Sequence, residues 1–274
     1  KLISPFILYY LCQKLLSNFY YWDDGSQLVP PHDKNVINEV KKVQVSDIKF
    51  EGVPEMITIL GKDFDKKYLD KVKTLSLSPE AIQKEHDLKI VFTPLHGTTY
   101  ELVPASLHNW GFTNIHTVPE QSIPDGDFPT VASANPEEPA AFKMALDLAR
   151  KIDADLAMAC DPDGDRIGIA VKNDAGEWTL LNGNQTNIIF TEYIIRRKKE
   201  LNQLKGGEYT VKTIVTTELI KDIAEKNHII CYDVYTGFKW IADVIRKEGG
   251  EKFIGGGEES FGYMPGAFTR DKDV

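Results

Sequence analysis

The feature that most constrains the fold is a regular alternation of short apolar segments with longer segments of helical length. Strands are expected at residues 89–93, 115–118, 155–160, 167–171, 211–216, 229–234 and 253–257. Helices are expected at residues 33–43, 65–75, 100–110, 139–152, 183–201, 218–227 and 238–247, with Pro139 in the first turn of its helix. Such alternation predicts an α/β protein with two consecutive β/α domains, whose mixed, mainly parallel sheets carry helices on both faces.

Turn-rich stretches divide the chain into three expected parts. A first boundary lies near Gly61, and a second unit begins after the turn at residues 173–176. The parts are residues 1–62, 63–180 and 181–274, the last of which is expected to be incomplete at its C-terminus. Residues 2–12 form an apolar run that is too short to span a bilayer and lacks a small-residue cleavage site. We expect a buried or interfacial helix there.

Charge and cysteine content exclude some classes of function. The 274 residues include 41 acidic and 32 basic side chains, which gives a formal net charge of -9. This balance argues against a protein that coats nucleic acid or an anionic membrane, but it leaves room for a local basic pocket. The three cysteines are widely spaced, and no pair has the spacing of a zinc or redox site. Reduced thiols in the cytoplasm are therefore expected.

The strongest chemical signal is the sequence DPDGDR at residues 161–166. Asp161, Asp163 and Asp165 follow an apolar strand at alternating positions, and Mg²⁺ prefers oxygen ligands of this kind. Three clustered acids repel one another unless something positive lies among them. We therefore predict that they hold one metal ion, with a phosphate oxygen bridging the ion and Arg166.

Two other readings of this loop fit less well. A calcium-binding EF-hand loop needs Gly at its sixth position and Glu at its twelfth, where this chain has Arg166 and Lys172. A phosphatase of the haloacid-dehalogenase type also places D-x-D after a strand, but a third Asp and an Arg do not follow there. Such a phosphatase, with Asp161 as nucleophile, is the nearest enzymatic alternative.

Two weaker motifs also follow strands. In GGGEES at residues 255–260, Glu258 and Ser260 offer oxygen atoms that suit vicinal sugar hydroxyls. The sequence YTGFK at residues 235–239 precedes a helix, whose free N–H groups can bind an anion. Lys239 adds positive charge there or can move a proton. Either motif alone is equally typical of an ordinary surface turn.

Together these motifs resemble the α-D-phosphohexomutases, the phosphoglucomutase and phosphomannomutase superfamily, in its bacterial form. Supporting patterns occur in the family's order from about Tyr21 onward: TPLHGT at 93–98, NPEEP at 135–139, GNQT at 183–186 and RDKD at 270–273. The resemblance implies that residues 1–62 are a remnant of a first, phosphoserine domain with a linker. Residues 63–180 would then be the second, metal-binding domain, and residues 181–274 the third, sugar-binding domain.

The resemblance also implies a reaction and roles for residues. In this family a phosphoserine gives its phosphoryl group to a hexose phosphate, the bisphosphate intermediate reorients, and its other phosphate returns to the serine. Mg²⁺ is the implied metal, and glucose 1,6-bisphosphate, or the matching hexose bisphosphate, the implied activator. The roles carried over are metal binding by Asp161, Asp163 and Asp165, a phosphoserine contact from Arg166, acid/base or phosphate chemistry by Lys239, and substrate binding by Thr236, Gly237, Glu258 and Ser260.

One departure from the family concerns the nucleophile. The family's serine lies in a TASHNP pattern shortly before the region that matches Tyr21, and residues 10–20 contain no such pattern. Ser133 is no substitute, because the sequence after it belongs to the second-domain pattern. We therefore expect an inactive fragment of an enzyme that interconverts hexose 1-phosphate and hexose 6-phosphate. The alternatives are a phosphatase-type hydrolase and a non-catalytic phosphosugar-binding module.

Overall fold

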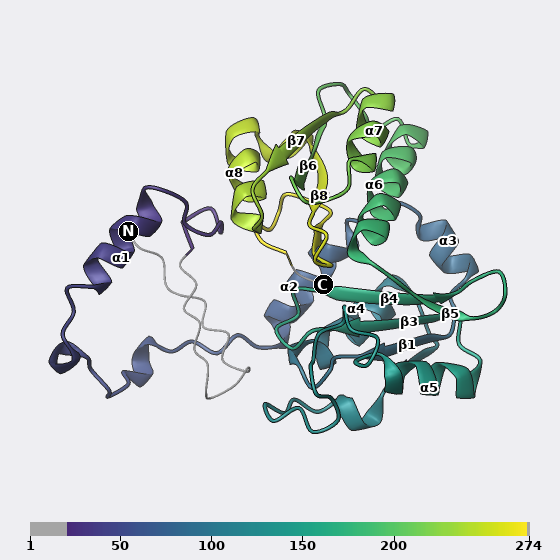
Figure 1. The fold of residues 1–274 in the computed structure, drawn as a ribbon, viewed down its shortest axis with the longest axis horizontal. Coiled ribbons are helices and arrows are strands. Elements are labelled where there is room, and N and C mark those ends of the chain that lie inside the picture. Colours follow the sequence, from purple (N-terminus) through teal and green to yellow (C-terminus); the bar gives the residue numbers. More distant parts are fainter. Residues whose placement is uncertain (1–20, 273–274) are drawn as a thin grey trace.

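The computed structural model describes residues 21–272, which form two α/β units and an N-terminal arm. In Figure 1 the first unit lies below and contains β1, β3, β4 and β5, and the second lies above and contains β6, β7 and β8. The helices α2 (Lys62–Lys73) and α3 (Pro79–Lys84) lead into the first unit. Within the described residues, no helix is long and apolar enough to cross a membrane.

The first sheet has five strands in the order β2-β1-β3-β4-β5. Its first three strands are parallel, and β3, β4 and β5 follow one another as two antiparallel hairpins, so that only β4 runs against the other strands. Side chains alternate between the faces, so Val91 packs on α5 and its neighbours Ile90 and Phe92 pack on α4. The elements are β1 (Ile90–Thr93), α4 (Leu102–Trp110), β2 (Ile115–Thr117), α5 (Lys143–Ile152), β3 (Leu156–Cys160), β4 (Ile167–Lys172) and β5 (Trp178–Leu181).

The second sheet has four strands in the order β7-β6-β8-β9, and only β9 is antiparallel. One face packs on α8 through Phe238 and Ile241, and the other packs on α6 and α7 through Ile195 and Ala224. The elements are α6 (Gly183–Glu200), β6 (Tyr209–Thr213), α7 (Leu219–Lys226), β7 (Ile230–Val234), α8 (Phe238–Glu248), β8 (Phe253–Gly257) and β9 (Tyr263–Met264). Both units therefore have the expected class of fold, with mixed, mainly parallel sheets and helices on both faces.

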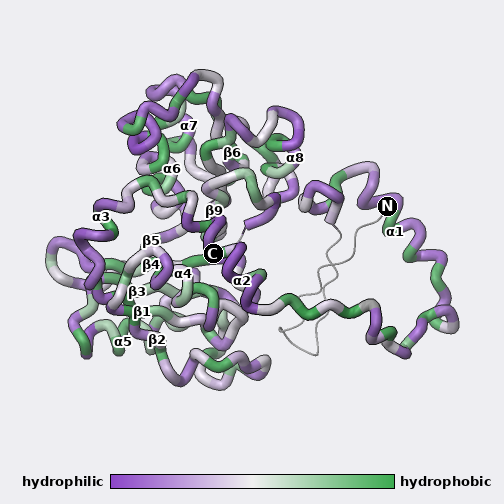
Figure 2. Tube along the Cα trace, turned by 180° about the vertical axis from the view of Figure 1, so that it is seen from behind, coloured by the Kyte–Doolittle hydropathy of each residue, from purple (hydrophilic) through white to green (hydrophobic). Residues whose placement is uncertain are grey.

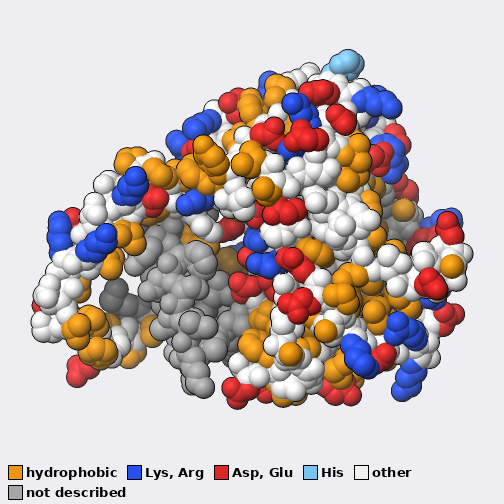
Figure 3. All heavy atoms as spheres, viewed as in Figure 1, with side chains coloured by type: hydrophobic (Ala, Val, Ile, Leu, Met, Phe, Trp, Pro, Cys, Tyr) orange, Lys and Arg blue, Asp and Glu red, His pale blue; other side chains and the backbone are white. Residues whose placement is uncertain are grey.

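The arm before α2 has a different character. It contains α1 (His32–Val40), which buries no residue, and reaches away from both sheets (Figure 1). Apolar positions recur along it in Figure 2, and hydrophobic side chains are visible on its surface in Figure 3. Phe50 is 85% exposed and Ile59 is 89% exposed. The start of the arm is nevertheless fixed, because Tyr21 and Gln27 both donate hydrogen bonds to Asp271.

Several expected elements differ from those observed. The helix expected from Pro139 begins only at Lys143, because Asn135 accepts hydrogen bonds from Glu137 and Glu138 and makes a turn first. The helix expected at residues 33–43 ends at Val40, and the strand expected at 211–216 ends at Thr213. The short elements α3, β5 and β9 were not expected at all. The helix expected at residues 2–12 lies outside the described residues.

Candidate functional site

The DPDGDR sequence forms the loop of the hairpin between β3 and β4. Asp161 directly follows the buried strand β3, and its Oδ1 accepts hydrogen bonds from the backbone N–H groups of Asp165 and Arg166, both at 3.0 Å. Gly164 lies in the left-handed region, with φ at +79°, where a side chain would be strained. The loop is therefore folded around the carboxylate of its own first residue.

The three aspartates of this loop converge. One carboxylate oxygen from each of Asp161, Asp163 and Asp165 lies within 4.8 Å of the other two. Burial, together with the charges of Asp163 and Asp165, raises the pKa of Asp161 to about 8. The neighbouring negative charges disfavour ionisation of Asp161, and a divalent cation would remove that penalty. Oxygen donors of this number and charge fit a hard cation such as Mg²⁺.

Arg166 lies beside these carboxylates and is held from the other side. Its Nη1 donates to Glu137 at 3.1 Å, and its Nε lies 3.6 Å from Asp161 and 3.7 Å from Asp165. Its side chain is about one-third exposed, so part of the guanidinium faces solvent. The NPEEP segment that supplies Glu137 thus orients the arginine next to the candidate metal site.

A second loop, the TPLHGT segment at residues 93–98, supports the DPDGDR loop at residues 161–166, which we call the metal loop. Thr98 donates hydrogen bonds from both its backbone N–H and its hydroxyl to the carbonyl oxygen of Pro162. A Cβ at Gly97 would overlap the backbone of Pro162. The TPLHGT pattern therefore acts in this structure as a backbone cradle for the metal loop.

In the second unit, Glu258 follows β8 and is almost fully buried. Its carboxylate accepts a hydrogen bond from the backbone N–H of Gly237, at the start of α8, and lies 3.5 Å from the hydroxyl of Ser260. Burial raises the pKa of Glu258. The GEES and TGFK motifs, which are 21 residues apart, thus form one site.

The neighbouring Glu259 fixes this loop to the rest of the unit. Its Oε2 accepts hydrogen bonds from the hydroxyls of Thr213 and Thr216, at 3.1 and 3.2 Å. From α6, the Nδ2 of Asn187 donates to the carbonyl oxygen of Glu258 at 2.8 Å. The sugar-reading role predicted for residues 258 and 260 therefore depends on supports from β6 and α6.

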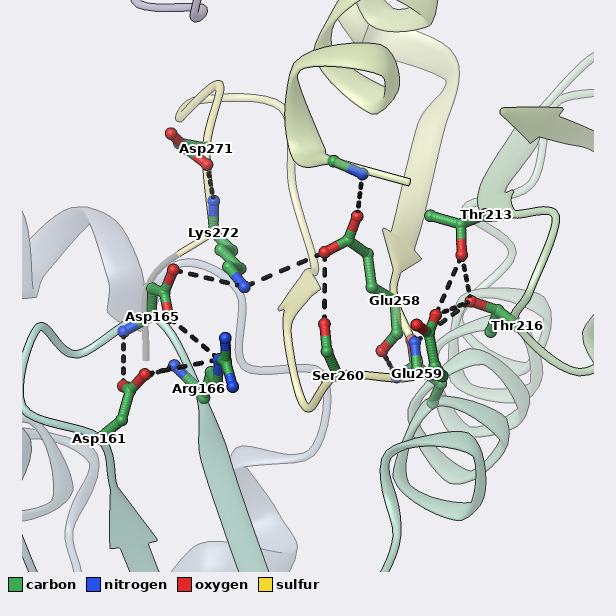
Figure 4. A network of polar contacts seen from close by, with 12 residues as sticks. Asp161, Asp165, Arg166, Thr213, Thr216, Glu258, Glu259, Ser260, Asp271 and Lys272 are labelled. Carbon is green, nitrogen blue, oxygen red and sulfur yellow. Dashed lines mark hydrogen bonds and ion pairs between the residues drawn. The ribbon is translucent and has the colours of Figure 1, made fainter. Parts of the chain in front are cut away.

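Lys272 connects the two units and was not singled out from the sequence. Its Nζ lies 3.3 Å from Asp165 of the metal loop and 4.0 Å from Glu258 (Figure 4). It also lies over the ring of Phe238, at 5.4 Å from the centroid. The only signal in the sequence was its place in the RDKD pattern, and spacing alone could not show that this segment returns between the two loops.

Two predicted site residues lie outside this network. Thr236 is exposed, and it is not among the residues joined in Figure 4. Lys239 lies on the first turn of α8 with its Nζ 5.3 Å from the ring centroid of Trp240. The structure thus joins Asp161, Asp165, Arg166, Gly237, Glu258 and Ser260 through direct contacts, places a carboxylate oxygen of Asp163 within 4.8 Å of the other two aspartates, and leaves Thr236 and Lys239 at the edge.

The chain is similar to known proteins over most of its length. Residues 66–176 match the family model "Phosphoglucomutase/phosphomannomutase, alpha/beta/alpha domain II", and residues 182–274 match the model of domain III. The phosphoglucomutase of Staphylococcus aureus (strain USA300) is 40% identical over 93% of this chain and 46% of its own length. The phosphomannomutase of Mycoplasmoides pirum is 35% identical over the same shares. The chain thus spans about half the length of the curated relatives that it matches.

Solved structures agree at the level of the fold. The crystal structure of a phosphoglucomutase/phosphomannomutase family protein from Burkholderia thailandensis superposes with a TM-score of 0.55 at 18% identity. The match covers 74% of this chain and 41% of that protein. Two family models in their expected order, the relatives and the shared fold lead to one assignment. The chain belongs to the phosphoglucomutase/phosphomannomutase family, the α-D-phosphohexomutases, and contains the α/β/α domains II and III of that family.

Proposed function

We propose that this chain supplies the metal loop and the sugar-reading loop of a phosphohexomutase. The reaction is the interconversion of hexose 1-phosphate and hexose 6-phosphate through a phosphoserine and a bisphosphate intermediate. The observation that carries the proposal is the convergence of the Asp161–Arg166 loop and the Glu258–Ser260 loop on Lys272. A bound phosphosugar needs cationic groups for its phosphate and acceptors for its hydroxyls, and this arrangement offers both.

On the metal side, Asp161, Asp163 and Asp165 would hold Mg²⁺. When bound, the ion would stabilise negative charge on a transferring phosphoryl group. Arg166 presents N–H donors beside it, and Glu137 keeps the guanidinium in place. Such donors are most effective when they are oriented before the reaction, because no reorganisation is then needed during it.

On the sugar side, Glu258 would accept hydrogen bonds from sugar hydroxyls, with Ser260 as a second contact. The N-terminus of α8 at Thr236 and Gly237 would lie near an anionic group, with Lys239 as an added cation. Lys272 would contact a phosphate between the two loops, because its Nζ lies between an acid of each loop. Glucose 1,6-bisphosphate, or the matching hexose bisphosphate, is the proposed activator, and the cytoplasm is the proposed location.

A phosphatase with Asp161 as nucleophile is less well supported. Its Oδ1 already accepts two backbone hydrogen bonds that hold the loop together. A nucleophile needs an exposed lone pair directed at the substrate, whereas this carboxylate is buried at the base of the loop. The contacts of Asp161 therefore favour a ligand of a metal ion.

The proposal is tested by calorimetric titration of the chain with glucose 1,6-bisphosphate, with and without Mg²⁺. Glu258→Gln should weaken binding by about ten- to a hundredfold, because a charge-assisted hydrogen bond is worth roughly 1.5–3 kcal/mol. Glu251→Gln, the same change at an exposed position of the same unit, is the matched control and should bind normally. Equal affinity for both variants, or no binding to the unaltered chain, would refute the proposal.

A further inference from the structure

A large cavity lies between the two units and apart from the site described above. Its volume is about 780 Å³, which is in the range of pockets that bind drug-sized molecules. Asp165 is part of its wall, but Asp161, Asp163, Glu258, Ser260 and Lys272 are not. The cavity therefore lies behind the metal loop and does not belong to the proposed phosphosugar site.

The wall of the cavity is mainly apolar and comes from both units. On α4, Val103, Leu107 and Trp110 recur at helical spacing, and Ser106 lies among them. The second unit contributes Phe190 and other side chains of α6. An occupant would therefore contact both units at once, which would favour one arrangement of the two.

A first polar feature of the wall, the indole of Trp110, indicates that the occupant carries a hydrogen-bond acceptor. The indole N–H of Trp110 is buried and has no hydrogen-bond partner in the part of the chain that the structure describes. An acceptor on a ligand would satisfy this donor, and a buried donor without a partner is costly.

The charged side chains of the wall differ in whether they are paired. Glu80 pairs with Arg197, Asp165 pairs with Lys272, and Asp271 accepts hydrogen bonds from Tyr21 and Gln27. Lys198, in contrast, forms no ion pair with any described residue. Among the described residues, the wall thus has one lysine without an ion pair, Lys198, and one carboxylate held only by neutral donors, Asp271, beside a large apolar interior.

We infer that this cavity binds an amphipathic anion, with its apolar body among the side chains of α4 and α6 and its single anionic group at Lys198. A neutral apolar molecule would contact the apolar side chains but would form no ion pair with Lys198. A small polar anion would pair with Lys198 but would leave the apolar side chains without contacts. The inference does not depend on the phosphohexomutase reaction, since none of the residues proposed to touch the sugar lines the cavity.

The test uses two fluorescent probes on the whole 274-residue chain. Anilinonaphthalene sulfonate has an apolar aromatic body and one negative charge, and N-phenylnaphthylamine has a similar body without the charge. We expect the sulfonate to bind saturably to a single site and more tightly than the neutral probe. Binding of the neutral probe with equal or greater affinity would overturn the inference.

Three variants locate the site. Ser106→Trp places a large side chain in the cavity. It should reduce the binding affinity for both probes by at least about tenfold, because a filled interior cannot accept further atoms. Ala105→Trp is the matched control, since Ala105 is exposed on the same helix, and it should leave both probes unaffected. Lys198→Met should weaken only the sulfonate, by about two- to fivefold, which is the range for a partly exposed charge pair.

The outcomes that oppose the inference are specific. If the probes bind at the exposed apolar arm, their binding would be unchanged in Ser106→Trp. That result would overturn the cavity as the binding site. Equal losses of both probes in Lys198→Met would overturn the role of the charge. Thermal melts followed by circular dichroism identify any variant that fails to fold, and Lys198→Met, which changes only one side chain of the wall, then provides the deciding measurement.

Discussion

At the scale of single residues, the metal loop makes the most direct prediction. Asp163 and Asp165 contribute no backbone capping comparable to that of Asp161, so their removal should leave the hairpin intact. We expect Asp163→Ala with Asp165→Ala to reduce Mg²⁺ affinity by at least about tenfold, a loss already seen when groups around metal ligands are removed. Calorimetry measures the affinity, and Asp174→Ala, in an exposed turn, is the control. Unchanged Mg²⁺ binding in the double variant would disprove the metal assignment.

Glu258 predicts a pH dependence of sugar binding. Burial raises the pKa of this carboxyl above its ordinary value, and only the ionised form accepts hydrogen bonds through both oxygens. Phosphosugar affinity should therefore be full above the raised pKa and should fall as the pH decreases through it. Titrations at a series of pH values measure this fall. In Glu258→Gln the component due to this group should disappear, and a profile identical to that of the unaltered chain would contradict the assignment.

The residues of the DPDGDR and GEES motifs could be singled out from the sequence, because each motif brings the side chains for its chemistry together in one short segment. The spacing in DPDGDR was sufficient to predict that Asp161, Asp163 and Asp165 meet, since one short loop contains them all. Lys272 and Glu259 escaped prediction because their partners are distant in sequence. No local pattern encodes the contact of Lys272 with Asp165, or that of Glu259 with Thr213, at the end of β6, and Thr216.

At the scale of elements, the start of α6 is predicted to set the position of the sugar-reading loop. A Cβ at Gly183 would overlap the carbonyl oxygen of Glu259, so only glycine allows this approach. Gly183→Ala should cost about 1–3 kcal/mol of unfolding free energy, as overpacking of a tight interior does. Urea unfolding measures the loss, and Gly52→Ala, which meets no neighbouring atom, is the control. Equal stabilities would show that the loop moves aside freely.

The N-terminal arm is the element on which sequence reasoning was least informative. Its apolar residues recur at helical spacing, which normally indicates a buried face, yet α1 buries none of them. Periodicity predicts that a face is apolar, but the partner that covers it must come from elsewhere in the fold. Val40, for example, is 49% exposed.

This exposure predicts where a protease cuts first. Limited trypsin digestion should cleave at Lys41, Lys42 or Lys49 before any site within the two sheets, because cleavage requires a segment that opens easily. Mass spectrometry of the first products identifies the sites. Initial cleavage in α6, at Arg196 or Arg197, would contradict the prediction that the arm is the least protected element.

At the scale of the whole molecule, the alternation of strands and helices predicted the class of fold but not all of its topology. The parallel strands β1, β3, β6 and β8 were expected, since a helix crosses between the members of each unit. The antiparallel additions β5 and β9, of four and two residues, were not expected. Their place in the sheets is determined by hairpin turns and by tertiary pairing.

The 274-residue polypeptide as it stands is expected not to turn over phosphohexoses. Phosphoryl transfer of the proposed kind needs a nucleophile that holds the phosphate between turnovers, and the sequence contains no serine in the family's TASHNP pattern. Ser133, the one similar position, donates its hydroxyl to Glu138 at 2.9 Å within its own turn. Binding groups without a positioned nucleophile do not accelerate the reaction. A coupled assay with glucose 1-phosphate, a trace of glucose 1,6-bisphosphate and Mg²⁺ should therefore remain at background. Activity that copurifies with the chain and disappears in Ser133→Ala would show that Ser133 acts as the nucleophile.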